Sequence, residues 1–307
     1  MKNSCLIIAT RTSPLAIWQA NHVKKKLLYY HPYLNISLLP LLTSGDIFKK
    51  NTQNQIQNKS SFINELEKSL LEYQSDIAVH SMKDFTSPLS NKLGIAAICK
   101  RGDPRDAIVS KYYKNIYSLP RKAIIGTSSI RRKFQLLLLR PDLIVYPLRG
   151  NIHSRINKLF QGHFHAIILA VAALKRLQIN KKLYTPLNLT NMIPAMGQGA
   201  IMVQYRLNDH KILDLVNLIH DKETAICVNS EKTIISKLAI GCRIPIGVYA
   251  KIKQKSQIWI KTIVGSVNGS TIIRSEGQSD ISEAKQLSYK QVQKLINQGA
   301  KKIIKSL

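Results

Sequence analysis

The sequence predicts an α/β protein that ends in a small α+β domain with an antiparallel sheet. Short apolar runs alternate with helical segments over roughly the first two thirds of the chain, and this βα order is typical of parallel sheets. From Asp221 onward the pattern changes to a helix followed by alternating strands, which is typical of an antiparallel sheet. The 307 residues, 45% of them hydrophobic, suffice for two or three domains with cores of their own.

The expected strands are apolar or alternating runs bounded by turn formers. They lie at 5–9, 36–42, 77–79, 93–99, 123–126, 144–146, 166–170 and 200–205, and again within 248–275. The expected helices carry apolar residues at helical spacing. They cover 14–30, 62–71, a segment from Ile130, a segment after Asn151, 209–219, 221–238 and 282–298.

Two local signals organise these elements. A capping Ser13 precedes Pro14 at the first helical position, and this pair predicts the start of the first helix. The breaker cluster Arg101–Pro104 indicates a domain boundary, because βα alternation begins afresh after it. The segments 43–61 and 186–198 are expected to be irregular chain.

The stretch from Asp76 to Asp84 places ionisable side chains where an apolar strand ends. His80, Lys83 and Asp84 follow that strand at once, and ligands of open α/β sheets bind at the carboxyl ends of strands. An Asp in this position also serves as a simple helix cap or turn residue. The stretch therefore favours a ligand site, and other motifs in the chain are needed to distinguish a ligand site from a simple cap.

The overall charge is strongly positive. Lys and Arg number 46 against 17 Asp and Glu, a formal charge of +29, which suits nucleic acid, an anionic membrane or a polyanionic small molecule. However, the lysines are scattered among many Asn and Ile residues, a look that compositional drift also produces. We therefore discount the bulk charge and give weight to cations at strand and helix ends.

Arginines recur beside helix N-termini that follow strands. Free backbone N–H groups and guanidinium groups there would point to common spaces and bind carboxylates or phosphates. One such arginine is more often a surface charge, but the recurrence indicates a ligand with several carboxylates. The candidate cations around one cleft are Arg11, Lys83, Arg131, Arg132, Arg149, Arg155 and Arg176.

The four cysteines show no CxxC pair and no His at metal-ligand spacing. This argues against a zinc site and a disulfide framework, and for a reducing compartment. Cys5, Cys99 and Cys227 lie in apolar strands or a helix and are predicted to be core residues. Cys242 lies in the turn Gly241–Gly247, which favours exposure and reactivity, although a lone Cys is more often a small buried hydrophobe.

No secretion signal or membrane span is visible. The N-terminal apolar run 5–9 is closed by Arg11, whereas a signal peptide needs an apolar core of about 7 to 15 residues. The longest apolar run, Ala166–Leu174, is far below the roughly 20 residues of a membrane span. We expect a cytoplasmic protein without membrane contact.

Several ordered motifs carry a close resemblance to a known family. They are Ala9–Ala16, His80–Asp84, Asp103–Asp106, Gly126–Arg132, Leu148–Asn151, Ile168–Arg176, Gly197–Gly199 and Gly241–Gly247. Over nearly its whole length the chain resembles the hydroxymethylbilane synthases, also called porphobilinogen deaminases. Motifs of this length in this order are very specific.

The resemblance implies three domains. Two are α/β domains like those of periplasmic binding proteins, which flank a cleft, and the third is a small C-terminal α+β domain. The implied bounds are 1–99 with 200–217, then 105–193, and then 222–305 with the cofactor cysteine. A monomer is the family expectation.

The resemblance also implies an enzyme of haem biosynthesis. Four porphobilinogen molecules would be polymerised head to tail, with release of ammonia, to the linear tetrapyrrole hydroxymethylbilane. A dipyrromethane primer would be bound covalently by a thioether bond to Cys242, and no metal is implied. Each pyrrole brings an acetate and a propionate, which gives the arginines at the strand ends their physical reason.

The matching motifs imply roles for individual residues. Asp84 is the candidate catalytic residue, because a carboxylate beside pyrrole N–H groups stabilises a cationic azafulvenium and assists proton transfer. The primer would be bound by Lys83, Asp84, Ser129, Arg131 and Arg132. Carboxylates of the substrate or chain would be bound by Arg11, Ser13, Arg149, Arg155 and Arg176.

Two loops depart from the family pattern. The loop leading to Lys59, the implied lid, is rich in glycine in the family. Here the corresponding positions are Gln57, Asn58 and Ser60, and Gln55 stands where lysine is common. Because glycine permits positive φ and wide loop motion, a stiffer or rerouted lid and reduced activity are expected. Ile240 and Arg243 also depart from the residues usual around the cysteine.

Two other functions are weighed against the enzyme. A non-catalytic anion receptor of the same fold would need no adduct on Cys242, but it would normally be exported. A nucleic-acid binder would use the +29 charge, yet the sequence shows no zinc finger, RNP-type aromatic pair or basic recognition helix. We rank both below the enzyme and expect no specific nucleic-acid partner.

Overall fold

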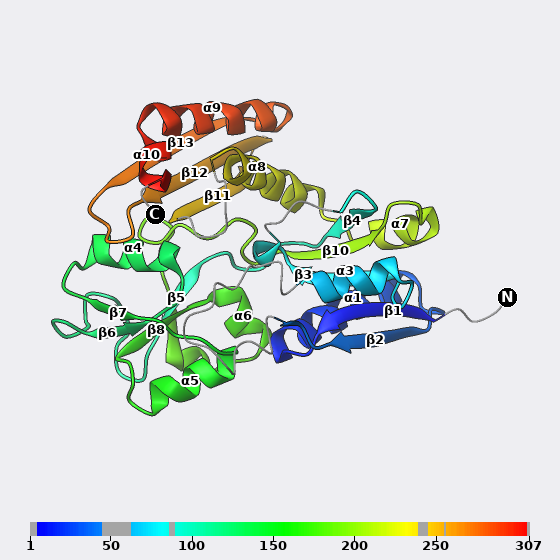
Figure 1. Ribbon diagram of the computed structural model, residues 1–307, viewed down its shortest axis with the longest axis horizontal. Helices are drawn as coiled ribbons and strands as arrows, with labels where there is room; N and C mark the ends of the chain where they lie inside the picture. Colours follow the sequence, from blue (N-terminus) through cyan, green and yellow to red (C-terminus); the bar gives the residue numbers. More distant parts are fainter. Residues whose placement is uncertain (1–4, 45–62, 86–89, 239–244, 255, 306–307) are drawn as a thin grey trace. The chain divides into compact units, whose positions relative to one another are not determined.

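The computed structural model describes residues 5–44, 63–85, 90–238, 245–254 and 256–305 (Figure 1). The chain divides into two compact units. The first unit comprises residues 1–102 and 199–225, and the second comprises residues 103–198 and 226–307.

The first unit contains a five-stranded mixed sheet in the order β2-β1-β3-β10-β4. Its strands are β1 (Leu6–Arg11), β2 (Ile36–Leu41), β3 (Ile77–Ser81), β4 (Leu93–Ile98) and β10 (Ile201–Arg206). Strand β1 runs parallel to β2 and β3, whereas β10 runs antiparallel to β3 and β4. The helices around it are α1 (Pro14–Tyr30), α3 (Asn64–Leu71) and α7 (His210–Asn217) (Figure 1).

The turn from β1 to α1 forms as the sequence predicts. The Ser13 hydroxyl accepts a hydrogen bond from the backbone N–H of Ala16 at 3.4 Å, and Pro14 is the first helical residue. Leu27 on the apolar stripe of α1 is fully buried in the core of the sheet. This packing fixes Arg11 and Ser13 at the end of β1.

The second unit begins with another five-stranded sheet, in the order β7-β6-β8-β5-β9. Its strands are β5 (Asp106–Val109), β6 (Ile124–Gly126), β7 (Ile144–Tyr146), β8 (Ala166–Ala170) and β9 (Tyr184–Pro186). Its helices are α4 (Ile130–Leu139), α5 (Ile152–Phe160) and α6 (Val171–Arg176).

The predicted parallel arrangement is confirmed for β6, β7 and β8, and the sheet also contains β5, a strand that was not predicted. That strand runs antiparallel to both β8 and β9. Parallel strands need a crossover connection, usually a helix. The segment 110–123 between β5 and β6 contains no helix, so β5 enters the sheet in the opposite direction.

The two five-stranded sheets follow one plan. In each, three neighbouring strands are parallel, the fourth is reversed, and the last is parallel to the first three. The reversed strand is β10 in the first sheet and β5 in the second. The sequence shows no fixed-period repeat, so the similarity is one of topology.

The C-terminal part of the second unit holds the predicted antiparallel sheet. Its strands β11 (Ile246–Lys253), β12 (Gln257–Gly265) and β13 (Ile272–Asp280) pair in chain order. Helix α8 (Lys222–Leu238) precedes the sheet and α9 (Ala284–Asn297) follows it. A last helix, α10 (Ala300–Lys305), was not predicted; Gly299, at φ +93°, separates it from α9.

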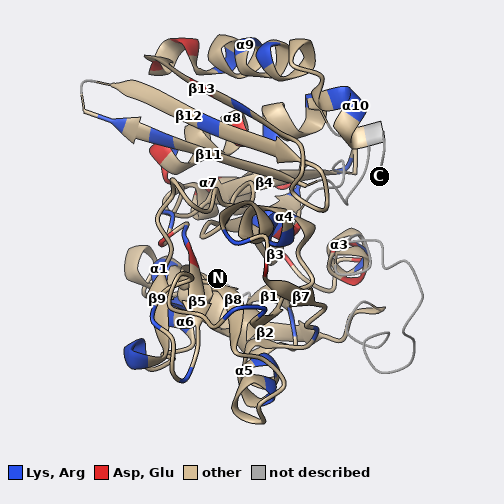
Figure 2. Ribbon diagram, turned by 90° about the vertical axis from the view of Figure 1, so that its left-hand side faces the viewer, with Lys and Arg blue, Asp and Glu red and all other residues tan. Residues whose placement is uncertain are grey.

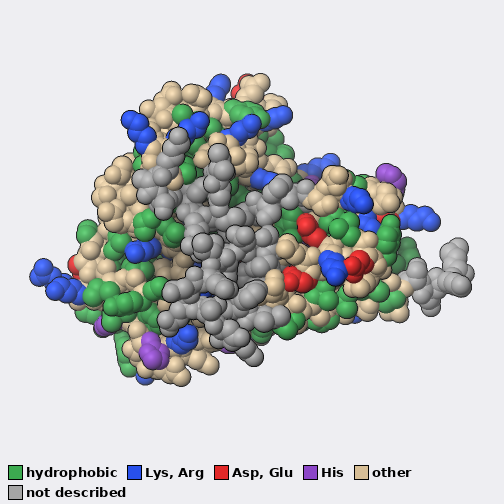
Figure 3. All heavy atoms as spheres, viewed as in Figure 1, with side chains coloured by type: hydrophobic (Ala, Val, Ile, Leu, Met, Phe, Trp, Pro, Cys, Tyr) green, Lys and Arg blue, Asp and Glu red, His purple; other side chains and the backbone are tan. Residues whose placement is uncertain are grey.

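Basic side chains are spread over many elements. Figure 2 shows Lys and Arg on α5, α9 and α10, and Figure 3 shows them separated by hydrophobic and uncharged residues on the face in view. This spread agrees with discounting the bulk charge. Within the described ranges, no helix is both long and apolar enough to cross a membrane.

Candidate functional site

One pocket of the first unit gathers predicted site residues at the end of β3. Arg11, Ser13 and Asp84 line it together with His80 and Ser81. The β1–α1 turn supplies the first two, and a 3₁₀ turn directly after β3 supplies Asp84. Strand β3 continues two residues beyond the predicted end, so His80 and Ser81 belong to the sheet itself.

Hydrogen bonds between two neutral side chains join the elements that line this pocket. Gln19 of α1 and Ser81 of β3 exchange two hydrogen bonds, from Gln19 Nε2 to Ser81 Oγ at 2.8 Å and from that hydroxyl to Gln19 Oε1 at 3.1 Å. They connect the helix to the strand end. Lys83 and Asp84 beside them are half-buried.

His80 is the most perturbed titratable group of the pocket. It is 7% exposed, and its Nε2 lies 3.0 Å from Oε1 of Gln204 on β10. Burial lowers the pKa of His80 to about 4; the Arg11 charge lowers it too, whereas the Gln204 hydrogen bond and the Asp84 charge oppose the shift. His80 is therefore neutral at pH 7. The sequence pointed to its motif but did not assign it a role.

Arg131 and Arg132 lie in a buried ion-pair cluster of the second unit. Arg132 donates from Nε and Nη2 to Oδ1 of Asp106 at 3.0 and 2.6 Å, and Arg131 Nη2 lies 2.7 Å from Oδ2 of the same residue. The two arginines are 6% and 7% exposed and Asp106 is fully buried. The carboxylate of Asp106 thus holds both guanidinium groups inside the fold, and their role in binding the primer stays a prediction.

The cluster keeps one net positive charge, since two arginines share one carboxylate. Burial raises the pKa of Asp106, but the charges and hydrogen bonds of Arg131 and Arg132 lower it more, so the carboxyl stays ionised well below its usual range. Burial also lowers the pKa of Arg131. Arginine nevertheless remains protonated in proteins, so the cluster stays ionic.

The remaining predicted residues of the second unit lie at helix ends. Ser129 is the N-cap of α4, and its hydroxyl accepts from the backbone N–H of Arg132 at 3.4 Å. Arg149 is exposed, whereas Arg155 is half-buried and donates from Nε to the Gly150 carbonyl at 2.8 Å. Arg176 is half-buried at the C-terminal end of α6.

Side-chain caps occupy part of the helix N-termini at which the sequence predicts free backbone N–H groups. Ser13, Ser129 and Asn151 cap α1, α4 and α5 with their own side chains. Each side-chain oxygen occupies one N–H group of the first turn. Anion binding at these ends must therefore use the remaining N–H groups or nearby side chains.

Asp103 and Arg105, at the start of the motif Asp103–Asp106, form a second charge cluster with Lys175. Arg105 donates from Nε and Nη2 to the two oxygens of Asp103 at 2.9 and 2.7 Å, and Lys175 Nζ lies 3.3 Å from Asp103 Oδ2. The hydrogen bonds from Arg105 lower the pKa of Asp103 to about 2, although burial opposes them. The sequence did not assign this cluster a role.

Several predicted residues lie outside the described ranges. These are Cys242 with its neighbours Ile240 and Arg243, and the lid residue Lys59 with Gln55, Gln57, Asn58 and Ser60. Cys99 and Cys227 are buried, as predicted. Cys5 is only partly buried, since it precedes β1, so its prediction as a core residue is wrong.

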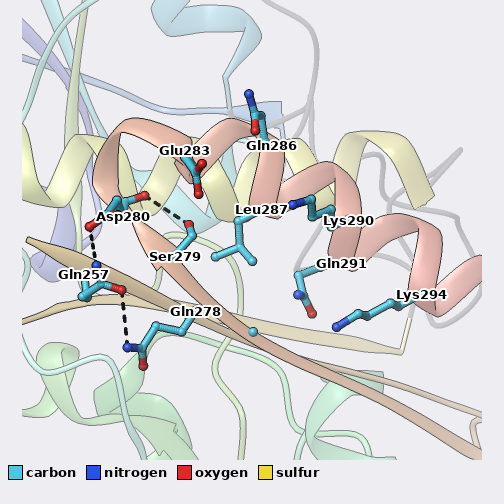
Figure 4. A pocket seen from close by; sticks show the side chains of 11 residues that line it. Gln257, Gln278, Ser279, Asp280, Glu283, Gln286, Leu287, Lys290, Gln291 and Lys294 are labelled. Atoms are coloured by element: carbon cyan, nitrogen blue, oxygen red, sulfur yellow. Dashed lines mark hydrogen bonds between the residues drawn. The ribbon is translucent and has the colours of Figure 1, made fainter.

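A second pocket, of about 430 Å³, lies between β13 and α9 (Figure 4). It contains none of the predicted site residues. Polar side chains on its wall bond to one another: Gln257 donates to Asp280, and Gln278 donates to Gln257 at 3.4 Å. No cluster of His, Cys, Asp and Glu that could hold a metal occurs in the part of the chain that the structure describes.

Comparison with known proteins covers almost the whole chain. The family model described as the dipyrromethane cofactor binding domain of porphobilinogen deaminase matches residues 6–214, and the model of its C-terminal domain matches residues 225–297. Porphobilinogen deaminase of Blochmanniella floridana is 47% identical over 300 residues, which cover 97% of this chain and 96% of the relative. That of Buchnera aphidicola subsp. Acyrthosiphon pisum (strain Tuc7) is 44% identical over 307 residues, 100% of this chain and 98% of the relative.

One solved structure gives a weaker comparison. A probable amino-acid ABC transporter extracellular-binding protein from Bacillus subtilis is 12% identical, with a TM-score of 0.42 over 70% of this chain and 90% of that chain. This likeness carries no argument about function. The two family domains and the full-length relatives do, and they show that the chain belongs to the porphobilinogen deaminase family.

Proposed function

We propose that the chain polymerises four porphobilinogen molecules head to tail to hydroxymethylbilane, with release of ammonia, as a step of haem biosynthesis. The observation that carries this proposal is the match of both family domains, which together span residues 6–214 and 225–297. The protein is accordingly a transferase that works from a dipyrromethane cofactor.

The proposed primer site fits an anionic group. Arg131 and Arg132 keep one net positive charge after pairing with Asp106, and a buried excess charge is costly unless a counter-charge approaches. A primer carboxylate supplies that counter-charge. We assign Lys83, Asp84, Ser129, Arg131 and Arg132 to the primer, with Cys242 as its covalent attachment. When bound, the dipyrromethane supplies a pyrrole with a free α-carbon as nucleophile.

The substrate carboxylates require cations at other positions. We assign this role to Arg11, Arg149, Arg155 and Arg176, with the Ser13 hydroxyl beside Arg11. Arg11 and Ser13 support the assignment by lining the same pocket as Asp84. Guanidinium groups bind carboxylates through paired N–H donors, and a hydrogen bond to a charged group contributes roughly 1.5 to 3 kcal/mol.

Asp84 is the proposed catalytic residue. Loss of ammonia from the substrate leaves an electron-poor carbon whose positive charge extends to the pyrrole N–H. The half-buried Asp84 carboxylate would accept a hydrogen bond from that N–H group and stabilise the charge. It would also assist removal of the ring proton after the carbon–carbon bond has formed.

The intact mass of the denatured protein tests the primer assignment. We expect a covalent excess equal to two linked pyrrole units, and we expect Cys242→Ser to lack it. An unmodified mass that also stays unchanged after incubation with porphobilinogen would contradict the proposal. It would favour the anion-receptor alternative.

The Asp84→Asn variant tests the catalytic assignment. We expect it to keep the primer mass and to lose most turnover, because the amide carries no negative charge. Asp214→Asn on the exposed side of α7 is the matched control and should behave like the unaltered protein. Near-normal turnover of Asp84→Asn would remove Asp84 from the mechanism.

The finer organisation is also part of the proposal. We propose three domains with the bounds 1–99 with 200–217, 105–193 and 222–305, a monomer in the cytoplasm, and no specific nucleic-acid partner. The three sheets support the division, because each has strands of its own. Oligonucleotide binding that falls steeply with salt would indicate only counterion release; binding that persists and depends on sequence would overturn this part.

A further inference from the structure

A chain of three side chains leads from α3 through β10 to the pocket of Asp84. Gln204 Nε2 donates to Oε1 of Glu67 on α3 at 2.7 Å, and Gln204 Oε1 lies 3.0 Å from His80 Nε2. In the register of β3 and β10, His80 is opposite Met202, so Gln204 is its diagonal neighbour on the same face of the sheet. His80 and Gln204 are both buried.

Hydrogen-bond chemistry fixes the direction of this chain. An ionised carboxylate only accepts hydrogen bonds, so Glu67 must face the amide nitrogen of Gln204. The amide oxygen of Gln204 must then face His80, and the ring nitrogen Nε2 must carry the hydrogen. In the neutral ring, the other nitrogen, Nδ1, is consequently without a proton.

The charges around His80 make its protonation state matter. The charges of Asp84 and Arg11 in the same pocket act on it, and Glu67 lies behind Gln204, from which it accepts a hydrogen bond. Phe85 contacts the ring edge-on, with the ring centroids 5.6 Å apart. An imidazolium here would add a second positive charge beside Arg11 and would attract the Asp84 carboxylate to itself.

We propose that Glu67 and Gln204 act as positioning residues that fix His80 as the Nε2–H tautomer in its buried place, where the ring stays neutral and leaves the Asp84 carboxylate available to the cationic substrate. The proposal rests on the proposed function, because it assigns His80 a task in that reaction. Glu67 and Gln204 lie behind the pocket and would act on Asp84 only through His80. The low pKa of His80, about 4, agrees with it.

The first test observes the ring directly. Nitrogen-15 NMR of the uniformly labelled protein distinguishes the two neutral tautomers from the imidazolium, and the His80→Asn variant identifies the signal among the eight histidines. We expect the neutral Nε2–H form from pH 8 down to about pH 5, since the pKa is about 4. An imidazolium or an Nδ1–H ring at pH 7 would overturn the proposal, whatever the protein catalyses.

The second test changes the chain at its centre. Gln204→Glu places a carboxylate against His80 Nε2 and should raise the pKa of His80, so that the ring is protonated near neutral pH. Because protonation occurs below the raised pKa, turnover should be lost at the lower pH values and should recover as the pH rises above it. We expect at least a tenfold loss at the acidic end, with the primer mass unchanged.

A matched control separates this effect from added charge. Gln278→Glu makes the same exchange at an exposed position of β13 and should leave the pH profile unchanged. If NMR shows an imidazolium in Gln204→Glu but its pH profile matches that of the control, His80 protonation does not affect Asp84 and the proposal is wrong. If Gln204→Glu does not fold, Glu67→Gln replaces it, because its amide no longer fixes the orientation of Gln204. Loss of the single Nε2–H tautomer is then the expected NMR result, and retention of that tautomer would overturn the proposal.

Discussion

Removal of the Asp106 carboxylate should destabilise the protein strongly. In Asp106→Asn, the guanidinium groups of Arg131 and Arg132, which contact the carboxylate at 2.7 and 2.6 Å, lose its negative charge and one of its two acceptor oxygens. Breaking a buried ion pair by removing one partner costs about 3–5 kcal/mol, because the other charge stays buried without compensation. Domains are stable by only about 5–15 kcal/mol, so the loss would be a large part of the total.

Urea unfolding at pH 7 measures this loss as a shift of the transition midpoint at constant slope. Asp142→Asn is the control, since Asp142 pairs with Arg140 at 2.7 Å but lies at the surface, where ion pairs contribute little. We expect the free energy of unfolding to fall far more in Asp106→Asn than in the control. Equal small losses in both variants would refute the conclusion that the buried excess charge depends on Asp106.

The same variant tests the link between the cluster and the primer. If Asp106 positions Arg131 and Arg132, the folded fraction of Asp106→Asn should carry less primer in the intact mass, while Asp142→Asn keeps it. Full primer occupancy of a destabilised Asp106→Asn would limit the role of Asp106 to folding.

Three further predictions concern other parts of the second unit. Glu231 of α8 is fully buried and accepts from the backbone N–H groups of Gly197 and Ala250 at 2.7 and 2.8 Å. Because Glu231→Gln offers one acceptor instead of two, its free energy of unfolding in urea should fall by about 1–3 kcal/mol. Glu223→Gln at the exposed start of α8 is the control, and an equal loss in the two variants would contradict the importance of the buried contacts. Gly265→Ala should lower the free energy of unfolding by about 1–3 kcal/mol, because a Cβ at this position would lie 2.6 Å from the fully buried ring of Phe134; a neutral effect would mean that the ring can move aside. The lowered pKa of Asp103 adds stability that is complete above the pKa of about 4 in the unfolded chain and is lost as the pH falls toward the folded pKa of about 2. The free energy of unfolding of Asp103→Asn should therefore depend less on pH in that interval. An unchanged pH dependence would mean that Asp103 does not contribute to stability in acid.

Local pattern predicted the parts of the fold that depend on neighbours in sequence. The cap at Ser13, the helix from Pro14 to Tyr30 and the strand 144–146 appear with the predicted bounds, because capping and apolar spacing act over a few residues. The reversed direction of β5, and the pairing of β5 and β10 with a strand on either side, depend on where segments distant in sequence enter the sheet. Periodicity contains no information about that return, so the sheet could not be predicted as mixed.

In the candidate site, too, the features that depend on neighbours in sequence were predicted and those that depend on distant residues were not. The strand end at His80–Asp84 and the turn at Arg11–Ser13 were predicted from local order, and they line one pocket. The partners that set their charges were not predicted. Gln204 follows His80 by 124 residues, and Asp106 precedes Arg132 by 26. One signal was available: a charged residue at the first position of the apolar strand that begins at Asp106 implies a buried partner of opposite charge.

The two units therefore provide different electrostatic settings for the anionic carboxylates and the cationic intermediate of the proposed reaction. In the second unit, one carboxylate is shared by two buried arginines, and the excess positive charge suits the carboxylates that every pyrrole carries. In the first unit, burial keeps the histidine beside Asp84 neutral and Gln204 fixes its ring orientation, so no imidazolium offsets the negative charge of Asp84. A reaction that binds anions and passes through a cation needs both settings, and each depends on residues, Asp106 and Gln204, that we assign no contact with the substrate. Variants at these two positions should therefore separate anion binding from stabilisation of the cation: Asp106→Asn should weaken the first, and Gln204→Glu should impair the second in a pH-dependent way.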